Sequence, residues 1–269
     1  MLSFLRCPSP LRKKQSHRTT ITTEHGRTRV TFFETQASAA FPPPMTYSSG
    51  GNIADSLDAT QAAKVKSASR TVMRSHIPPG NTIHKPPYHF HTSQSETFKV
   101  ISGAMLATVE GRSCLISSLD ANPYITIEQG QYHTFINHSS TNGLVVEVAL
   151  DPPRLDHPVH GALPPEAHPS SAYTNLDEQF FRNWYCYFDD CYNAGVRPSL
   201  FQLMLWLWVF DCYLVMPGPW PHCSRIIRDS LSKLGTWILG VLIGKWTLGY
   251  RDNYQEYYDP DHRNNWGAV

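Results

Sequence analysis

Three histidines and a glutamate are the residues of this chain whose types and spacing most clearly point to chemistry. His89 and His91 are separated by one residue, Glu96 follows after a short polar stretch, and His133 lies further along the chain. In an extended strand, alternate side chains share a face, so His89 and His91 point the same way and Phe90 points the other. If strand pairing brings Glu96 and His133 beside them, three imidazoles and a carboxylate meet in one place.

Such a mixed set of nitrogen and oxygen donors indicates a particular class of metal ion. It suits divalent Fe, Mn, Ni, Cu or Zn and is poor for Ca or Mg. We predict one divalent ion, held by His89, His91, Glu96 and His133. Four protein ligands leave an octahedral ion two positions for water, oxygen or substrate.

Strand alternation also predicts which side chains share an interior with these ligands. The expected neighbours are mostly apolar, and they suit a small hydrophobic substrate better than a charged one. The predicted pocket residues are Tyr88 at the mouth, Phe98, Val100, Phe135 and Asn137.

The centre of the chain, residues 68–153, is expected to consist of short strands separated by glycine-containing turns. Many short strands at regular spacing are typical of a β-sandwich or barrel. The segments that we predict as strands are Arg70–His76, Tyr88–His91, Glu96–Ile101, Met105–Val109, Ser113–Ser117, Tyr124–Glu128, His133–Asn137 and Leu144–Leu150.

These residues resemble the two conserved motifs of the cupin superfamily. The first motif is matched from His89 to Gly103, although its leading glycine, Gly80, lies too far upstream. The second is matched at Gly130, His133 and Asn137, with Glu128 where the family has proline. The resemblance implies a mainly β fold, a single jelly-roll-like cupin barrel at residues 68–153, and a metal held by the four ligands, for which iron is the first choice.

The regions on either side of the centre have different compositions. Residues 1–67 begin with a basic, serine- and threonine-rich stretch that is compatible with a transit peptide but more typical of a partly disordered tail, with an extra strand expected at Arg29–Glu34. A proline-rich linker is expected at 154–174. Residues 175–269 are aromatic-rich, and we predict helices at 176–193, capped by Asn175, at 200–216, and at 226–250.

The apolar segment 200–250 leaves several interpretations open. Leu200–Met216 is short for a membrane span and contains Asp211, whereas Gly240 and Gly244 would let two helices approach closely. A hairpin at a membrane surface, a buried helical layer and a homodimer contact all fit. The net charge of +1 gives no reason to expect nucleic acid, and six cysteines without a C-x-x-C pair predict reduced thiols in an intracellular, cytoplasmic protein.

The overall layout is similar to the cupin-domain oxidoreductases of fungal polyketide gene clusters, especially those that make salicylaldehyde-type products. The likeness rests on Pro86–His91 and on a cupin followed by an aromatic helical extension. It implies a metal-dependent redox step on a lipophilic polyketide intermediate, together with pathway reductases. The alternatives are a non-redox isomerase, cyclase or dehydratase, and a ligand-binding or scaffold protein, because one fold hosts many chemistries.

Overall fold

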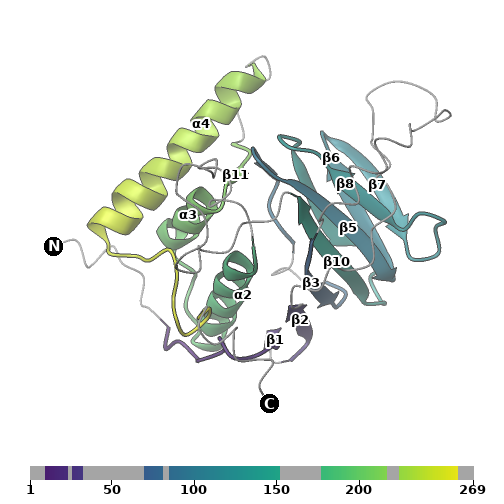
Figure 1. The fold of residues 1–269 in the computed structure, drawn as a ribbon, viewed down its shortest axis with the longest axis horizontal. Coiled ribbons are helices and arrows are strands. Elements are labelled where there is room, and N and C mark those ends of the chain that lie inside the picture. Colours follow the sequence, from purple (N-terminus) through teal and green to yellow (C-terminus); the bar gives the residue numbers. More distant parts are fainter. Residues whose placement is uncertain are drawn as a thin grey trace, which may run out of the picture.

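Two antiparallel sheets enclose the core, and the helices gather on one side of them (Figure 1). The computed structural model describes residues 10–23, 26–32, 70–80, 85–151, 177–216 and 224–259. The six-stranded sheet runs β1 (Thr20–Thr23), β2 (Thr28–Phe32), β3 (Arg70–Ile77), β10 (Leu144–Asp151), β5 (Ser95–Ser102) and β8 (Tyr124–Ile127). The five-stranded sheet runs β11 (Cys212–Leu214), β4 (His89–His91), β9 (His133–Asn137), β6 (Ala104–Val109) and β7 (Arg112–Ser117).

All eight strands predicted for the centre of the chain are present, with ends that differ by only one residue. Alternation explains this agreement: along β5 the burial alternates between partly buried and buried residues, which places Glu96, Phe98 and Val100 on the inner face. The core between the sheets is built from such inward-facing residues and extends to the helices.

The basic start of the chain is part of the fold. The strand predicted at Arg29–Glu34 corresponds to β2, and β1, which the sequence left in a disordered tail, pairs with it. The fully buried Arg182 donates from its guanidinium to the carbonyl oxygens of Gln15 and Arg18, and its Nε donates to Glu178 over 2.7 Å. The described part of this basic start, residues 10–23 and 26–32, is therefore held to the rest of the fold by a buried partner that its composition does not indicate.

Helix α2 (Glu178–Asn193) begins two residues later than predicted. Its N-cap is Asp177, whose side chain accepts a hydrogen bond from the Phe180 N–H, so the expected cap at Asn175 was wrong. Gly195, with φ of 66°, ends the helix as expected. The proline-rich linker predicted at 154–174 lies outside the described residues.

The predicted helix Leu200–Met216 is two elements. Helix α3 (Leu200–Val209) stops before Asp211, and the chain then forms β11, which pairs with β4. The prediction was wrong at its carboxyl end because a left-handed backbone at Asp211, with φ of 52°, cannot continue a helix.

The last predicted helix is continuous but changes type. Helix α4 (Arg225–Trp237) passes into the π-helical segment η4 (Ile238–Thr247), and at its end the Leu248 N–H donates to the carbonyl of Ile243, five residues earlier. η4 packs on α3 through Gly240 and Gly244, as their spacing predicted.

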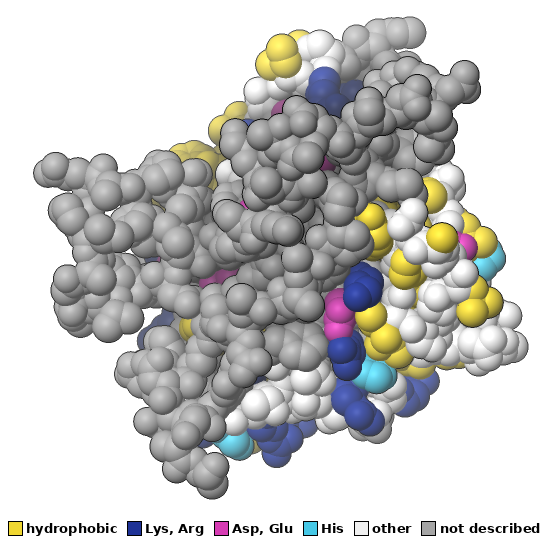
Figure 2. Space-filling view, turned by 45° about the vertical axis from the view of Figure 1, so that its right-hand side comes forward, with side chains coloured by type: hydrophobic (Ala, Val, Ile, Leu, Met, Phe, Trp, Pro, Cys, Tyr) yellow, Lys and Arg dark blue, Asp and Glu magenta, His cyan; other side chains and the backbone are white. Residues whose placement is uncertain are grey.

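No helix among the described residues has both the length and the apolar character needed to cross a bilayer. The membrane-surface and homodimer alternatives for residues 200–250 stay predictions. On the part of the face in Figure 2 that is not grey, acidic and basic side chains lie next to one another beside the barrel.

The packing of η4 on α3 gives a test of the fold. A Cβ at Gly240 would lie 2.6 Å from the backbone of Met204 and Leu205, so Gly240→Ala should lower the free energy of unfolding by about 1–3 kcal/mol. Gly143→Ala is the control, because its Cβ would meet only the Ile77 carbonyl at an ordinary 3.6 Å. Urea denaturation measures both, and equal midpoints for the two variants would contradict this packing.

Candidate metal centre

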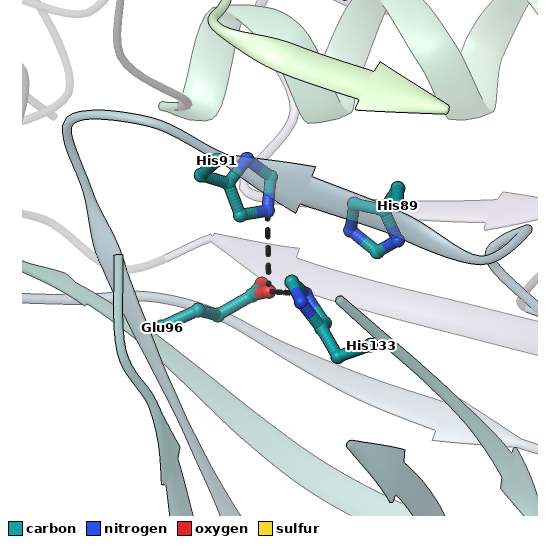
Figure 3. A group of neighbouring side chains, drawn as sticks. All are labelled: His89, His91, Glu96 and His133. Carbon is teal, nitrogen blue, oxygen red and sulfur yellow. Dashed lines mark hydrogen bonds and ion pairs between the residues drawn. The ribbon is translucent and has the colours of Figure 1, made fainter. Parts of the chain in front are cut away.

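The structure brings the four predicted ligands together at one end of the barrel interior. His89 and His91 lie on β4, Glu96 on β5 and His133 on β9, and their side chains converge (Figure 3). Their ligand atoms all lie within 4.8 Å of one another, and each residue is at most 6% exposed. His89 and His133 are direct partners across β4 and β9, which explains how a residue distant in sequence reaches the pair.

The backbone joins the two motifs as well. Gly130 N–H donates to the His91 carbonyl over 2.6 Å, and Gly130 has φ of 79°, which favours glycine at this turn. The turn before β9 is thereby tied to the strand that carries the histidine pair. The positive φ of this turn explains why the second motif has a glycine at position 130.

Each imidazole is held through Nδ1 by a backbone carbonyl. The partners are Pro87 for His89 at 2.8 Å, Gln131 for His133 at 2.9 Å and Asp211 for His91 at 3.3 Å. A carbonyl can only accept, so Nδ1 carries the proton in all three rings. Nε2 is then the atom left to face the centre, which is the arrangement of metal-binding histidines.

The centre itself fits a metal ion. Within the described part of the chain, His91 Nε2 has no hydrogen-bond partner although it is buried, and Glu96 Oε2 lies 3.7 Å from it and 3.2 Å from His133 Nε2. Two opposite ligands of one ion are about 4.2 Å apart at ordinary bond lengths. Small side-chain shifts would therefore bring all four donors onto one ion.

The charge states of the ligands agree with this fit, with one exception. Burial alone would raise the pKa of Glu96, but His133 and His91 hold that pKa far below its ordinary value, so the carboxylate is charged. Burial and the neighbouring His133 lower the pKa of His89 well below 6.5, so His89 is neutral. Burial opposes protonation of His91, yet Cys212 and Glu96 raise its pKa to about 10, so an incoming ion must displace this proton.

A cavity of about 270 Å³ opens from the ligands towards the helices. His89 and Glu96 lie at its buried end, and the exposed residues Lys85, Pro87 and Leu200 belong to its outer part. Its walls are apolar and come from the barrel, α2, α3 and β11. The helical residues among them are Phe180, Phe181, Trp184, Tyr185, Phe188, Leu200, Leu203, Met204 and Leu207.

Comparison with known proteins identifies the family. No family model matches the chain. A protein named probable oxidoreductase virH, from the fungus Hypocrea virens, is 32% identical over 179 residues, which cover 66% of this chain and 70% of virH. This chain belongs to the same family of fungal oxidoreductases. Its two antiparallel sheets and paired histidine motifs make the fold a cupin barrel with a C-terminal helical part.

Other relatives extend the family. An oxidoreductase of Arthrobotrys oligospora is 29% identical over 64% of this chain and 59% of its own length, and the epoxidase atD of Aspergillus terreus is 30% identical over 64% and 46%. The chain thus spans only about half to three fifths of the length of these two proteins. Among solved structures, the Cnp3 cupin domain of Schizosaccharomyces pombe matches with 13% identity, a TM-score of 0.25 and coverage of 29% of this chain and 52% of that one, too slight a likeness to add to the assignment.

Two of the five predicted pocket residues of this oxidoreductase line the cavity. Phe98 and Phe135 line the cavity, with ring centroids 4.8 Å apart. Tyr88 does not line the cavity. It is two positions from Phe90, so its side chain lies on the same outer face and packs with Phe90, Tyr132 and Tyr213.

Val100 and Asn137 face inward but lie too far along their strands from the ligands. Val100 is core, and the Asn137 amide donates to the Ile77 and Asn142 carbonyls, which fixes a loop. The alternation of side chains predicts the face on which a residue lies but not its depth along the barrel, and neither residue lines the cavity.

Sequence reasoning missed the contribution of the C-terminal region of this oxidoreductase. The helical walls, Cys212 and the Asp211 carbonyl behind His91 all come from it. The available signal was the unusual density of aromatic residues after residue 177, together with a lone acid, Asp211, within an apolar run.

The ligand set gives a direct test. Adding a divalent ion at about a hundred times its Kd should stabilise the protein by about 2.7 kcal/mol and raise its melting temperature by several degrees. His133→Ala should abolish this shift, whereas His138→Ala, at an exposed position of the same segment, should keep it. A metal-dependent shift of the same size in His133→Ala would contradict the ligand assignment.

Proposed function

We propose that the protein is a metal-dependent cupin oxidoreductase that oxidises a small, aromatic, polyketide-type compound in fungal secondary metabolism, in a salicylaldehyde-type pathway. The observation that carries the proposal is the buried group of three histidines and one glutamate at the closed end of an apolar cavity. Such a cavity positions the reacting part of a hydrophobic molecule beside the ligand set and keeps water away.

The size of the cavity supports the proposed substrate class. A cavity of about 150 Å³ holds benzene. The cavity of about 270 Å³ therefore has room for one ring with several substituents. Phe98 and Phe135 offer aromatic faces next to Glu96, and planar rings stack favourably on such faces.

The side chains around the ligands have distinct tasks. A bound divalent ion would supply Lewis acidity and, if it is iron, electron exchange with dioxygen. The carbonyl partners of the histidines fix their rings, and Glu96 supplies the negative charge. Burial raises the pKa of Tyr185 in the cavity wall, so this side chain stays a neutral phenol.

The names of the relatives support oxygen chemistry. Several are named oxidoreductases, and one is named an epoxidase. An epoxidase adds an oxygen atom to a carbon–carbon double bond, a reaction that suits an apolar cavity with a metal at its end. For this chain we propose only that dioxygen is the oxidant.

Oxygen uptake tests the proposal. Protein loaded with Fe(II) should consume dioxygen in step with the loss of a hydroxybenzyl alcohol or hydroxybenzaldehyde from a panel of substituted rings. Turnover without oxygen uptake would contradict the proposal and favour an isomerase, cyclase or dehydratase. Tight binding without turnover of any panel member would contradict it in favour of a ligand-binding protein.

Filling the cavity separates substrate binding from metal binding. Leu203 lies in the cavity wall on α3, so Leu203→Trp should reduce binding of an aromatic panel compound at least tenfold and leave the metal content unchanged. Leu115→Trp, on the exposed side of β7, is the matched control and should alter neither. Isothermal titration calorimetry with metal analysis measures both quantities, and unaltered binding in Leu203→Trp would contradict the assignment of the cavity.

A further inference from the structure

Asp211 occupies a backbone conformation that few residues adopt. It follows the last turn of α3 with φ of 52°, in the left-handed region, where glycine is the usual residue and Asp or Asn the usual exceptions. It is 6% exposed and lies outside the group of four metal ligands. Its place at the junction between α3 and β11 calls for a structural reason.

The carboxylate of Asp211 binds the loop that connects β4 and β5. Oδ2 accepts from the backbone N–H of Thr92 at 2.9 Å, the N–H of Ser93 at 2.8 Å and the Ser93 hydroxyl at 2.6 Å. Oδ1 accepts from the Thr92 hydroxyl at 2.5 Å. This loop joins His91 to Glu96, so one side chain fixes the segment between two of the ligands.

The backbone of the same residue contacts the metal centre directly. The Asp211 carbonyl accepts the Nδ1 proton of His91 at 3.3 Å. The strand that follows pairs with the histidine strand, with Cys212 opposite His91 and Leu214 opposite His89. The carboxylate thus fixes the turn whose carbonyl orients the ring.

We propose that Asp211 is a positioning residue of the metal centre, through which the C-terminal region sets the orientation of His91. The inference rests on the proposed metal-dependent function. Without the four hydrogen bonds, the strained turn relaxes, the carbonyl moves away from Nδ1, and His91 loses its fixed direction. Metal affinity then falls, because the outer partners of ligating histidines are typically worth 10–100-fold in affinity.

A series at position 211 separates the hydrogen bonds from the backbone. Asp211→Gly tolerates the left-handed backbone but removes all four bonds that hold the turn in place, so we expect Co(II) affinity to fall at least tenfold, with altered visible absorption of the bound ion. Asp211→Asn can keep the oxygen that accepts three of these bonds, and its affinity should stay within about threefold of wild type. The double variant Thr92→Val/Ser93→Ala keeps the two backbone donors. Its Co(II) affinity should lie between those of Asp211→Gly and Asp211→Asn.

The control is Asp177→Ala, which removes the N-cap of α2 and lowers stability without removing a hydrogen bond of Asp211. It should leave affinity and spectrum unchanged. Equal Co(II) affinity and spectra in wild type, Asp211→Gly and the double variant would overturn the proposal, as would an equal loss in Asp177→Ala.

A second measurement separates this inference from the metal function. In metal-free protein, proton–nitrogen NMR should detect the His91 Nδ1 proton in wild type and Asp211→Asn but lose it to solvent exchange in Asp211→Gly. This pattern, found in a protein that binds no metal, would support the positioning role and contradict the proposed function. A His91 signal that is the same in all three proteins would overturn the positioning role.

Discussion

Burying the Glu96 carboxylate is the constraint on which the rest of the structure depends. A charge removed from water costs several kcal/mol unless partners compensate it. Here Glu96 Oε2 lies 3.2 Å from His133 Nε2 and 3.7 Å from His91 Nε2, but His91 Nε2 has no hydrogen-bond partner among the described residues. A divalent ion would bind both Glu96 and His91. This explains why three backbone carbonyls accept hydrogen bonds from Nδ1 and so orient the imidazole rings.

The C-terminal region belongs to the site and is not an appendage to it. Helices α2 and α3 close the open side of the barrel, and β11 extends the sheet beside the histidine strand. Arg225 on α4 donates to the Gly130 carbonyl and to Glu110, so a second contact from this region supports the turn before His133. The barrel alone would present its ligands at an open end.

The barrel strands and the four ligands could be predicted because their signals are local. Alternation along β5 and the spacing of His89, His91 and Glu96 are visible in a few consecutive residues. The end of α3 could not be predicted, because Leu200–Met216 has the composition of one helix and the turn at Asp211 is stabilised by Thr92 and Ser93, more than a hundred positions away. The position of Val100 and Asn137 outside the cavity has a similar cause, since depth along a barrel depends on strand pairing and not on the alternation of side chains.

The most direct test of the central claim is anomalous diffraction from crystals grown with a divalent ion, recorded at the absorption edge of that ion. The account predicts one peak at about 2.0–2.2 Å from Nε2 of His89, His91 and His133 and from a carboxylate oxygen of Glu96. A peak elsewhere, or a fully ordered site with no anomalous signal, would contradict it.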